Sequence, residues 1–467
     1  MKWSEAFDAV VMLTWSTWKT EPRSNRYHYA SRFARELPVF FVQPWSKPGT
    51  PLRVEPTEIP GVEVVHCSSA LRAQDVLQFR QLLSKRRVRF PLLWIYNSLH
   101  YEPLIAAMPQ ALRVFHATED FFTPSVGWGL DQQATAESVR RQLSCIDLLI
   151  AVSDGVLASC RIKGDYSGRA LVVENGCDAA FLLSAVNAQP SQTVHESKLI
   201  AVFQGGINKR LDFELLHDLV RLLPDWEFWF CGSDEHGANR WRTLCGHVNV
   251  KYFGVLEPTN LANMLCSSTV GLIPFVQDEW IGNSFPLKAL EYVACGLPVV
   301  SVPITALRRF SSDIYFARTA VEFSAALQAA ARTRMDRASL NRRRQLAEEN
   351  SYDTRFTVMI KALLAERERL AREVQGRLTI QLRAPSALEL WTEGCASLAE
   401  RLVSRMWRTV PLRLRASLKH RAQSLVHRAQ CAEGERSRFE RLLHATLKFA
   451  LPARLRRRVT GTMRQDR

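Results

Sequence analysis

The stretch NSFPLKALEYVACGLPVV, residues 283–300, decides how this chain folds and what it can bind. Lys288 and Glu291 are one helical turn apart, so they lie on one face of a helix that we expect to run from Asn283 to Gly296. A lysine and a glutamate near a helix N-terminus suit a ligand with both phosphate and hydroxyl groups, such as a nucleotide sugar. An exposed Lys–Glu pair on a core helix is the alternative interpretation.

Gly296 is a natural helix stop, and the apolar residues after Pro298 predict a buried strand over 299–302. The same alternation of strand and helix extends along most of the chain. It predicts strands at 9–14, 39–42, 62–66, 92–96, 113–117, 148–152, 171–173, 199–203, 227–230, 250–253, 271–275, 299–302 and 314–316. Helices are expected at 26–36, 75–85, 132–146, 213–223, 258–266, 320–332 and 354–375, with a short one after Ser153.

This alternation predicts an α/β fold with parallel sheets. The stretch 185–197, AVNAQPSQTVHES, is polar and typical of a linker, so we expect two doubly wound, Rossmann-like domains at 1–184 and 198–375. Ligands bind outside the carboxyl ends of strands in such sheets, which predicts a deep cleft between the two domains.

Composition favours a globular protein of at least two domains, because 467 residues exceed a single core. No apolar run reaches the roughly 18 to 20 residues that span a bilayer. Acidic residues stand where a signal peptide would be apolar, and the ten cysteines are scattered singly. These features predict a cytosolic protein with reduced thiols and no zinc site.

The net charge of +16 is concentrated in the C-terminal residues 376–467, where 20 basic residues against 7 acidic ones give +13. This tail has a helical pattern that mixes Leu, Trp and Phe with arginine and includes three consecutive arginines, Arg456 to Arg458. Basic amphipathic helices of this kind suit an anionic membrane surface. Solvated helices and nucleic-acid binding are the alternatives, and nucleic acid is the least favoured because the remaining residues are nearly neutral.

Three motifs together resemble the glycosyltransferases of the GT-B fold, group 1 or family 4-like, that build bacterial surface polysaccharides. They are the Gly205-Gly206 pair after a strand, Asn175-Gly176-x-Asp178 before the linker, and the 283–300 stretch. The resemblance covers roughly residues 8 to 375 and leaves the tail outside. It implies that the second domain binds the nucleotide sugar and that no cofactor or metal ion is needed. No Asp-x-Asp motif follows a strand, so we expect no metal site.

The resemblance also implies donor-binding roles. Glu291 would hold the ribose hydroxyls and Lys288 would lie near the diphosphate, while Gly205 and Gly206 let backbone amides approach the phosphates. Many relatives carry a second glutamate eight positions before the one that matches Glu291, and this chain has Asn283 there, which can hydrogen-bond a sugar hydroxyl but carries no charge. The basic residues after the Gly-Gly turn are displaced from the family pattern, and Arg210 is the expected phosphate contact.

The first domain should hold the acceptor. Glu119 and Asp120 follow the strand 113–117, and a carboxylate there could accept the proton of an attacking hydroxyl. A strand-end Ser-Asp in xanthan glucuronosyltransferase resembles Thr118-Glu119, which favours Glu119 over Asp120. A helix N-cap is the alternative role for this pair. Arg23 and Asn25 in the first loop are further acceptor-side candidates.

We therefore expect a glycosyltransferase that moves a sugar from a nucleotide-diphosphate sugar to a lipid-linked or growing polysaccharide acceptor, docked by its basic tail on the inner face of the plasma membrane. A nucleotide-sugar epimerase of the same architecture and a non-catalytic binding protein are the alternatives. The resemblance implies retention of anomeric configuration, whereas a Glu119 base would imply inversion, and the sequence leaves both open.

Overall fold

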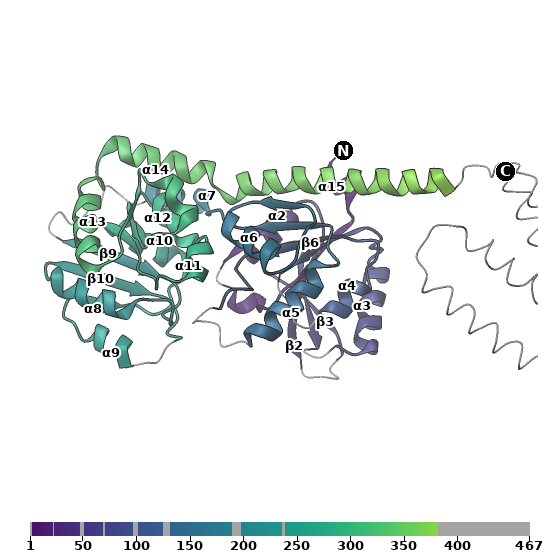
Figure 1. Ribbon diagram of the computed structural model, residues 1–467, viewed down its shortest axis with the longest axis horizontal. Helices are drawn as coiled ribbons and strands as arrows, with labels where there is room; N and C mark the ends of the chain where they lie inside the picture. Colours follow the sequence, from purple (N-terminus) through teal and green to yellow (C-terminus); the bar gives the residue numbers. More distant parts are fainter. Residues whose placement is uncertain are drawn as a thin grey trace, which may run out of the picture. The chain divides into compact units, whose positions relative to one another are not determined.

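The computed structural model describes residues 2–21, 23–46, 51–68, 71–96, 101–124, 131–188, 198–235 and 239–381, and the statements below refer to these residues. Residues 1–375 form one compact unit. The basic tail predicted from its sequence lies outside the described residues from position 382 on. Within the compact unit two parallel sheets with flanking helices follow one another along the chain (Figure 1).

The first half is built on an eight-stranded sheet in the order β3-β4-β2-β1-β5-β6-β7-β8. Its strands are β1 Ala9–Leu13, β2 Val39–Ser46, β3 Arg53–Pro56, β4 Val62–Ser68, β5 Pro91–Ile95, β6 Leu112–Ala117, β7 Leu148–Ala151 and β8 Ala170–Val172. The sequence did not predict β3, which is short, half-exposed and antiparallel to β4. All other pairings are parallel, as expected from the strand–helix alternation.

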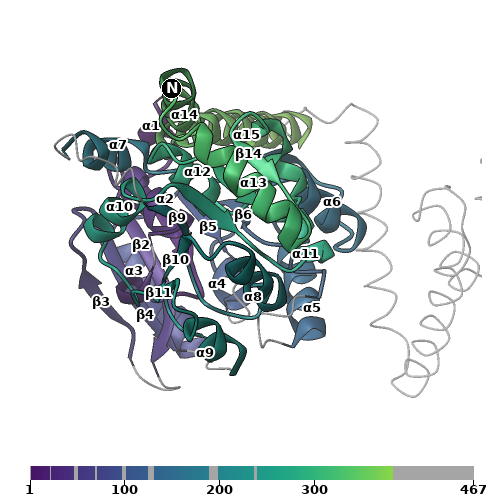
Figure 2. The same ribbon diagram turned by 90° about the vertical axis from the view of Figure 1, so that its left-hand side faces the viewer.

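The second half is a six-stranded parallel sheet in the order β11-β10-β9-β12-β13-β14. Its strands are β9 Leu199–Gln204, β10 Trp226–Cys231, β11 Val250–Tyr252, β12 Val270–Ile273, β13 Val299–Ser301 and β14 Ile314–Phe316. The strand order reverses between β9 and β12, which is where ligands bind in doubly wound sheets. Figure 2 faces this half and shows α13 beside β14, with α12 and α14 next to it.

The helices of the first half are α1 Trp3–Ala6, α2 Asn25–Phe33, α3 Ala73–Lys85, α4 Glu102–Ala106, α5 Gln132–Leu143 and α6 Asp154–Ile162, with the 3-10 helix η1 Trp18–Thr20. Those that follow are α7 Ala179–Ala188, α8 Phe213–Leu222, α9 Asn239–Cys245, α10 Pro258–Cys266, α11 Glu279–Asn283, α12 Leu287–Ala294, α13 Ala320–Arg332, α14 Arg337–Glu349 and α15 Tyr352–Gln381, with η2 Thr305–Phe310. The sequence analysis missed the short helices α1, α4, α7, α9 and α11, and also α14.

The single helix expected from Asn283 to Gly296 is wrong at its N-terminal end. The structure has two helices here, α11 and α12, separated by a short extended segment. Asn283 ends α11, and α12 begins at Leu287 after Pro286, which has an extended ψ of 118°. A residue before proline avoids the helical region, so the chain breaks at Ser284–Phe285. Gly296 ends α12 as expected, with a φ of +75° that only glycine adopts easily.

The chain crosses between the halves twice. After β8 it enters α7, which packs against α10, α12 and α14 of the second half. The second crossing is made by α15, which follows α14 and extends onto the first half (Figure 1). There Tyr352, Met359 and Leu363 are buried together with Trp3 and Phe33. The linker predicted at 185–197 overlaps the last residues of α7, and its residues 189–197 lie outside the described part, so its extent stays a prediction.

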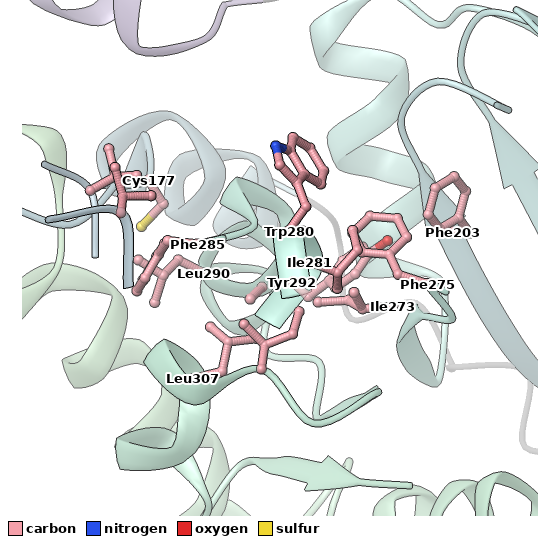
Figure 3. Close-up of a cluster of buried hydrophobic side chains, with 14 of the residues drawn as sticks. Cys177, Phe203, Ile273, Phe275, Trp280, Ile281, Phe285, Leu290, Tyr292 and Leu307 are labelled. Atoms are coloured by element: carbon pink, nitrogen blue, oxygen red, sulfur yellow. The ribbon is translucent and has the colours of Figure 1, made fainter. Parts of the chain in front are cut away.

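Tyr292 anchors α12 to the centre of its sheet. Its hydroxyl accepts a hydrogen bond from the Gln204 backbone amide at 2.9 Å and donates one to the Leu272 carbonyl at 3.3 Å, so it bridges the strands β9 and β12. The side chain is fully buried in the apolar cluster that Figure 3 shows, next to Leu290 and Ile281. Gly271 makes room for the ring, since a Cβ there would lie 2.3 Å from it.

We expect Tyr292→Phe to lower the free energy of unfolding by about 1 to 3 kcal/mol, because it leaves the buried Gln204 amide without its acceptor. Tyr252→Phe is the matched control, since the Tyr252 hydroxyl donates to the Gly232 carbonyl at 2.8 Å but its side chain is 40% exposed. Urea unfolding followed by tryptophan fluorescence measures both. Equal losses in the two variants would contradict the anchoring role.

Candidate active site

A cavity of about 1190 Å³ lies between the two halves and collects most of the residues singled out from the sequence. Its walls come from the loops that follow β1, β6, β8, β9 and β10, together with α7 and the N-terminal part of α12. The carboxyl ends of both sheets therefore face this cavity. The predicted residues on its walls are Arg23, Asn25, Glu119, Asp120, Gly205, Gly206, Arg210, Lys288 and Glu291, whereas Asn283 is not among them.

Lys288 extends from the first turn of α12 into a cage of aromatic rings. Its Nζ atom is 4.2 Å from the ring centroid of Phe203 and 4.7 Å from that of Phe275. Gly205, at a φ of +124°, leaves the space for this group, because a Cβ there would lie 2.9 Å from Nζ. Burial, together with the nearby Arg210 charge, lowers the pKa of Lys288 to about 7, although the Glu291 carboxylate acts in the opposite direction. The amine is therefore poised to gain a proton when an anion enters.

Glu291 lies one turn after Lys288, and among the described residues its hydrogen-bond partner is Gln204. Gln204, at the end of β9, donates from Nε2 to its Oε2 atom at 2.6 Å. Burial raises the pKa of this carboxyl, which the positive charge of Lys288 partly offsets. No ion pair within 4.0 Å joins Lys288 and Glu291 in the described part of the chain, so the second carboxylate oxygen can bind a ligand hydroxyl.

The loop after β9 is fixed by Asn208. Its Oδ1 atom accepts hydrogen bonds from the backbone N–H and Nε of Arg210 at 3.1 and 3.3 Å. Its Nδ2 donates to Glu235 at 2.8 Å, and a Cβ at Gly206 would lie 2.7 Å from that carboxylate. The sequence analysis missed Glu235, whose only signal is its position shortly after a strand end.

Glu119 and Asp120 are adjacent but differ in their surroundings. Burial raises the pKa of Glu119 to about 7, partly offset by Arg210 and Arg26, and its Oε2 atom is buried without a hydrogen-bond partner. Asp120 accepts hydrogen bonds from the Phe122 and Thr123 amides and from Ser159. Those bonds outweigh burial and lower the pKa of Asp120. Glu119 therefore has bonding capacity for a ligand, whereas Asp120 has little.

Asn283 joins the halves. Its Nδ2 atom donates to Asp120 Oδ2 at 2.9 Å, its backbone carbonyl accepts from the Ser153 hydroxyl, and a Cβ at Gly155 would meet its side chain at 2.5 Å. A Lys163–Glu279 ion pair at 2.6 Å lies along the same contact between α6 and α11. The arrangement directs Asn283 toward the first half, so a sugar contact from this residue stays an untested prediction.

Asn25 is 4% exposed and belongs to a chain of buried amides. It accepts from the Tyr352 hydroxyl at 3.0 Å and donates to Asn175 at 2.7 Å. Asn175 in turn donates to the Phe285 carbonyl at 2.7 Å. This series of hydrogen bonds connects α2, the segment after β8, α15 and the residues just before α12. It favours a structural role for Asn25.

Other site types find little support in the described residues. They include no group of three His, Cys, Asp or Glu side chains arranged to hold a metal ion. Their eight cysteines are free thiols. None of their helices is long and apolar enough to cross a membrane.

Comparison with known proteins identifies the second half. Residues 198–332 match the family described as "Glycosyl transferases group 1". We call this matched region the group-1 domain. Lys288, Glu291, Gly205 and Arg210 all lie inside it, which confirms the resemblance drawn from the sequence for this half. Glu119 and Arg23 lie outside it.

Relatives agree with this assignment. A putative teichuronic acid biosynthesis glycosyltransferase of Bacillus subtilis (strain 168), TuaH, is 25% identical over 196 residues, which are 40% of this chain and 49% of that protein. The aligned chain thus spans about half the length of this curated relative.

Solved structures extend the likeness across both halves. The sucrose-phosphate synthase of Thermosynechococcus elongatus superposes with a TM-score of 0.56 at 15% identity, over 79% of this chain and 100% of that one. Anabaena HepE in complex with UDP gives 0.54 at 12% identity, over 79% and 100%. These similarities confirm the predicted fold, two Rossmann-like domains in the GT-B arrangement.

The low pKa of Lys288 predicts that the affinity of this cavity wall for anions depends on pH. We expect the affinity for a nucleoside diphosphate to fall by up to roughly tenfold per pH unit above about pH 7, because the neutral amine attracts no phosphate. Isothermal titration calorimetry between pH 6 and 9 measures this dependence of the affinity on pH.

Two variants separate this effect from other titrating groups. Lys288→Arg keeps its charge and should flatten the pH profile, while Lys361→Arg, an exposed lysine on α15, should leave the profile unchanged. A wild-type affinity that stays constant to pH 9 would contradict the expectation.

Proposed function

We propose that this protein transfers a sugar from a nucleotide-diphosphate sugar to a lipid-linked or growing polysaccharide acceptor. The observation that carries the proposal is the pairing of Lys288 and Glu291 on the cavity wall, at the N-terminal part of α12 within the group-1 domain. A buried cation and a carboxylate with a free oxygen match the two chemical parts of such a donor, the diphosphate and the ribose diol.

The donor would lie along the second half. Lys288 and Arg210 supply positive charge for the diphosphate, and the Gly205-Gly206 turn allows backbone amides close to it. The cavity of about 1190 Å³ is larger than the roughly 300 to 1,000 Å³ usual for one small ligand, which supports simultaneous binding of a donor and an acceptor. The UDP bound to Anabaena HepE makes uridine nucleotides the first to test.

Group-1 membership supports retention of configuration. In a retaining transfer the acceptor oxygen attacks from the side on which the phosphate leaves, and its proton passes to the departing phosphate oxygen. Glu119 would then orient the acceptor hydroxyl by a hydrogen bond from the opposite wall of the cavity. Its unpartnered Oε2 atom and its near-neutral pKa suit this role, whereas Asp120 is already bonded to Ser159 and Asn283.

The acceptor class rests on the TuaH relative, whose name places it in teichuronic acid biosynthesis. An epimerase of the same architecture is the second candidate, and it would convert the donor without any acceptor. A binding protein without activity is the third. Release of nucleoside diphosphate only when an acceptor is present favours the transferase over both.

We expect Glu291→Ala to raise the KM for the donor sugar by roughly tenfold to a hundredfold, because a carboxylate–hydroxyl hydrogen bond is worth about 1.5 to 3 kcal/mol. Glu119→Ala should instead lower kcat by roughly a hundredfold with little change in donor KM, because the acceptor hydroxyl loses the hydrogen bond that orients it. Release of nucleoside diphosphate from a panel of donor sugars measures both.

Glu348→Ala removes an exposed glutamate on α14 and serves as the matched control for both variants. Unchanged kinetics in Glu291→Ala would remove the basis for the donor site. An effect of Glu119→Ala confined to the KM for the donor sugar would remove the proposed role in transfer.

The basic tail would bring the enzyme to its acceptor. A lipid-linked acceptor lies at the membrane, and the net charge of +13 over residues 376–467 suits an anionic lipid surface. We propose peripheral docking on the inner face of the plasma membrane, through residues that lie outside the described part from 382 on.

Flotation with vesicles of anionic or zwitterionic lipid tests this docking. We expect the full chain to float with anionic vesicles only, since each basic residue near such a surface contributes about 1 kcal/mol. Deletion of residues 382–467 keeps α15 and should abolish flotation. Binding that survives the deletion would contradict docking by the tail.

A further inference from the structure

Arg23 is a cation on the cavity wall without a counter-ion. It is exposed, it lines the cavity from the loop before α2, and no carboxylate of the described residues lies within 4.0 Å of its guanidinium. Lys19, on η1, lines the same part of the wall and also has no such ion pair. Positive charge therefore faces the cavity from the half opposite to the group-1 domain.

Two aromatic rings fix the orientation of the Arg23 guanidinium. Its Cζ atom is 5.2 Å from the ring centroid of Tyr27 on α2 and 5.9 Å from that of Phe181 on α7. Stacking on ring faces leaves the N–H edges of a guanidinium available. A planar fork of free N–H donors matches the two oxygens of a carboxylate or phosphate.

The carboxylate closest in sequence, Glu21, is already occupied. It accepts from the Ser16 hydroxyl at 2.8 Å, from the Ser24 amide at 3.2 Å and from Arg26 Nε at 2.7 Å. Its side chain has no exposed surface, and these bonds hold its pKa below the usual value against the effect of burial. Glu21 thus neutralises Arg26 and leaves Arg23 uncompensated.

The acids Asp178, just before α7, and Glu58 also line the cavity, and among the described residues Asp178 forms no ion pair within 4.0 Å with Lys19 or Arg23. Glu58 is exposed and accepts from Trp18 Nε1 at 3.0 Å. It forms no ion pair within 4.0 Å with Lys19 or Arg23, so a solvated carboxylate there reduces the local positive charge without occupying the guanidinium.

The backbone of Arg23 is held by the fold. Its φ of +48° lies in the left-handed region, which is unfavourable for a residue with a Cβ. Two residues further on, Asn25 accepts a hydrogen bond from the Tyr352 hydroxyl of α15 at 3.0 Å, and the His28 ring stacks on Tyr352 with centroids 4.0 Å apart. The second crossing of the chain therefore keeps this arginine in place on the wall.

The donor diphosphate does not require Arg23, because Lys288 and Arg210 on the facing wall already supply positive charge for it. We propose that the acceptor is anionic and that Arg23 binds a carboxylate or phosphate group carried by the acceptor. This inference rests on the proposed function and specifies its acceptor. A uronic acid supplies the carboxylate form, and a sugar phosphate or lipid phosphate supplies the phosphate form.

Binding of small probes to the full-length protein saturated with UDP tests the proposal. Isothermal titration compares glucose, glucuronic acid and glucose 6-phosphate, which share one ring and differ in charged group. We expect at least one charged probe to bind tenfold or more tightly than glucose, and Arg23→Gln to remove that preference. Preference for glucuronic acid identifies a carboxylate acceptor, and preference for glucose 6-phosphate identifies a phosphate acceptor.

Two further variants complete the design. Arg23→Lys keeps the charge without the planar fork and should retain part of the preference. Arg87→Gln is the matched control, because Arg87 is an exposed arginine with a φ of +59° outside the cavity lining. It should behave as wild type.

Equal binding of charged and uncharged probes by the wild type, or a preference that survives Arg23→Gln, would overturn the inference. Failure of the proposed function is a separate result. It would appear as no UDP binding and no release of nucleoside diphosphate from any donor, whereas failure of this inference alone leaves both intact.

Discussion

The two hydrogen bonds of the Asn175 side-chain amide are the interaction on which the rest of the structure depends. The oxygen and the nitrogen of a buried asparagine amide each need a partner. Here Asn175 Oδ1 accepts from Asn25 of the first half, and Asn175 Nδ2 donates to the Phe285 carbonyl of the second half. Loss of either would leave a buried polar group unpaired, which is costly. These two hydrogen bonds therefore fix the position of one half against the other where the chain crosses between them.

The same contacts place both walls of the cavity. The Phe285 carbonyl lies just before α12, so the helix that carries Lys288 and Glu291 is positioned relative to the first half. Tyr352 bonds to Asn25 and stacks on His28, so the start of α15 fixes the loop that carries Arg23. The charged groups on both walls of the cavity thus depend on one continuous set of buried polar contacts.

The charged groups of the cavity are distributed according to burial. On the wall formed by the second half, Lys288 lies in an aromatic cage, and with a pKa of about 7 its neutral and charged forms are nearly equal in free energy near pH 7. On the opposite wall Arg23 is exposed and charged. Between them Glu119 is a carboxyl with a pKa of about 7, available to a neutral hydroxyl in either protonation state. Opposite walls with different charge behaviour suit two substrates of different chemistry.

The sequence by itself determined the fold class and the family resemblance of the second half, because both depend on local patterns. Strand–helix periodicity indicated two parallel sheets, and the spacing of Lys288, Glu291 and Gly296 indicated a binding helix that ends at a glycine. The tertiary structure alone decided what Asn283, Asp120 and Asn25 do, since their partners lie 163, 163 and 150 positions away in the chain. It also separated Glu119 from Asp120, because burial and unpaired atoms depend on packing and adjacent residues of one charge look alike in sequence.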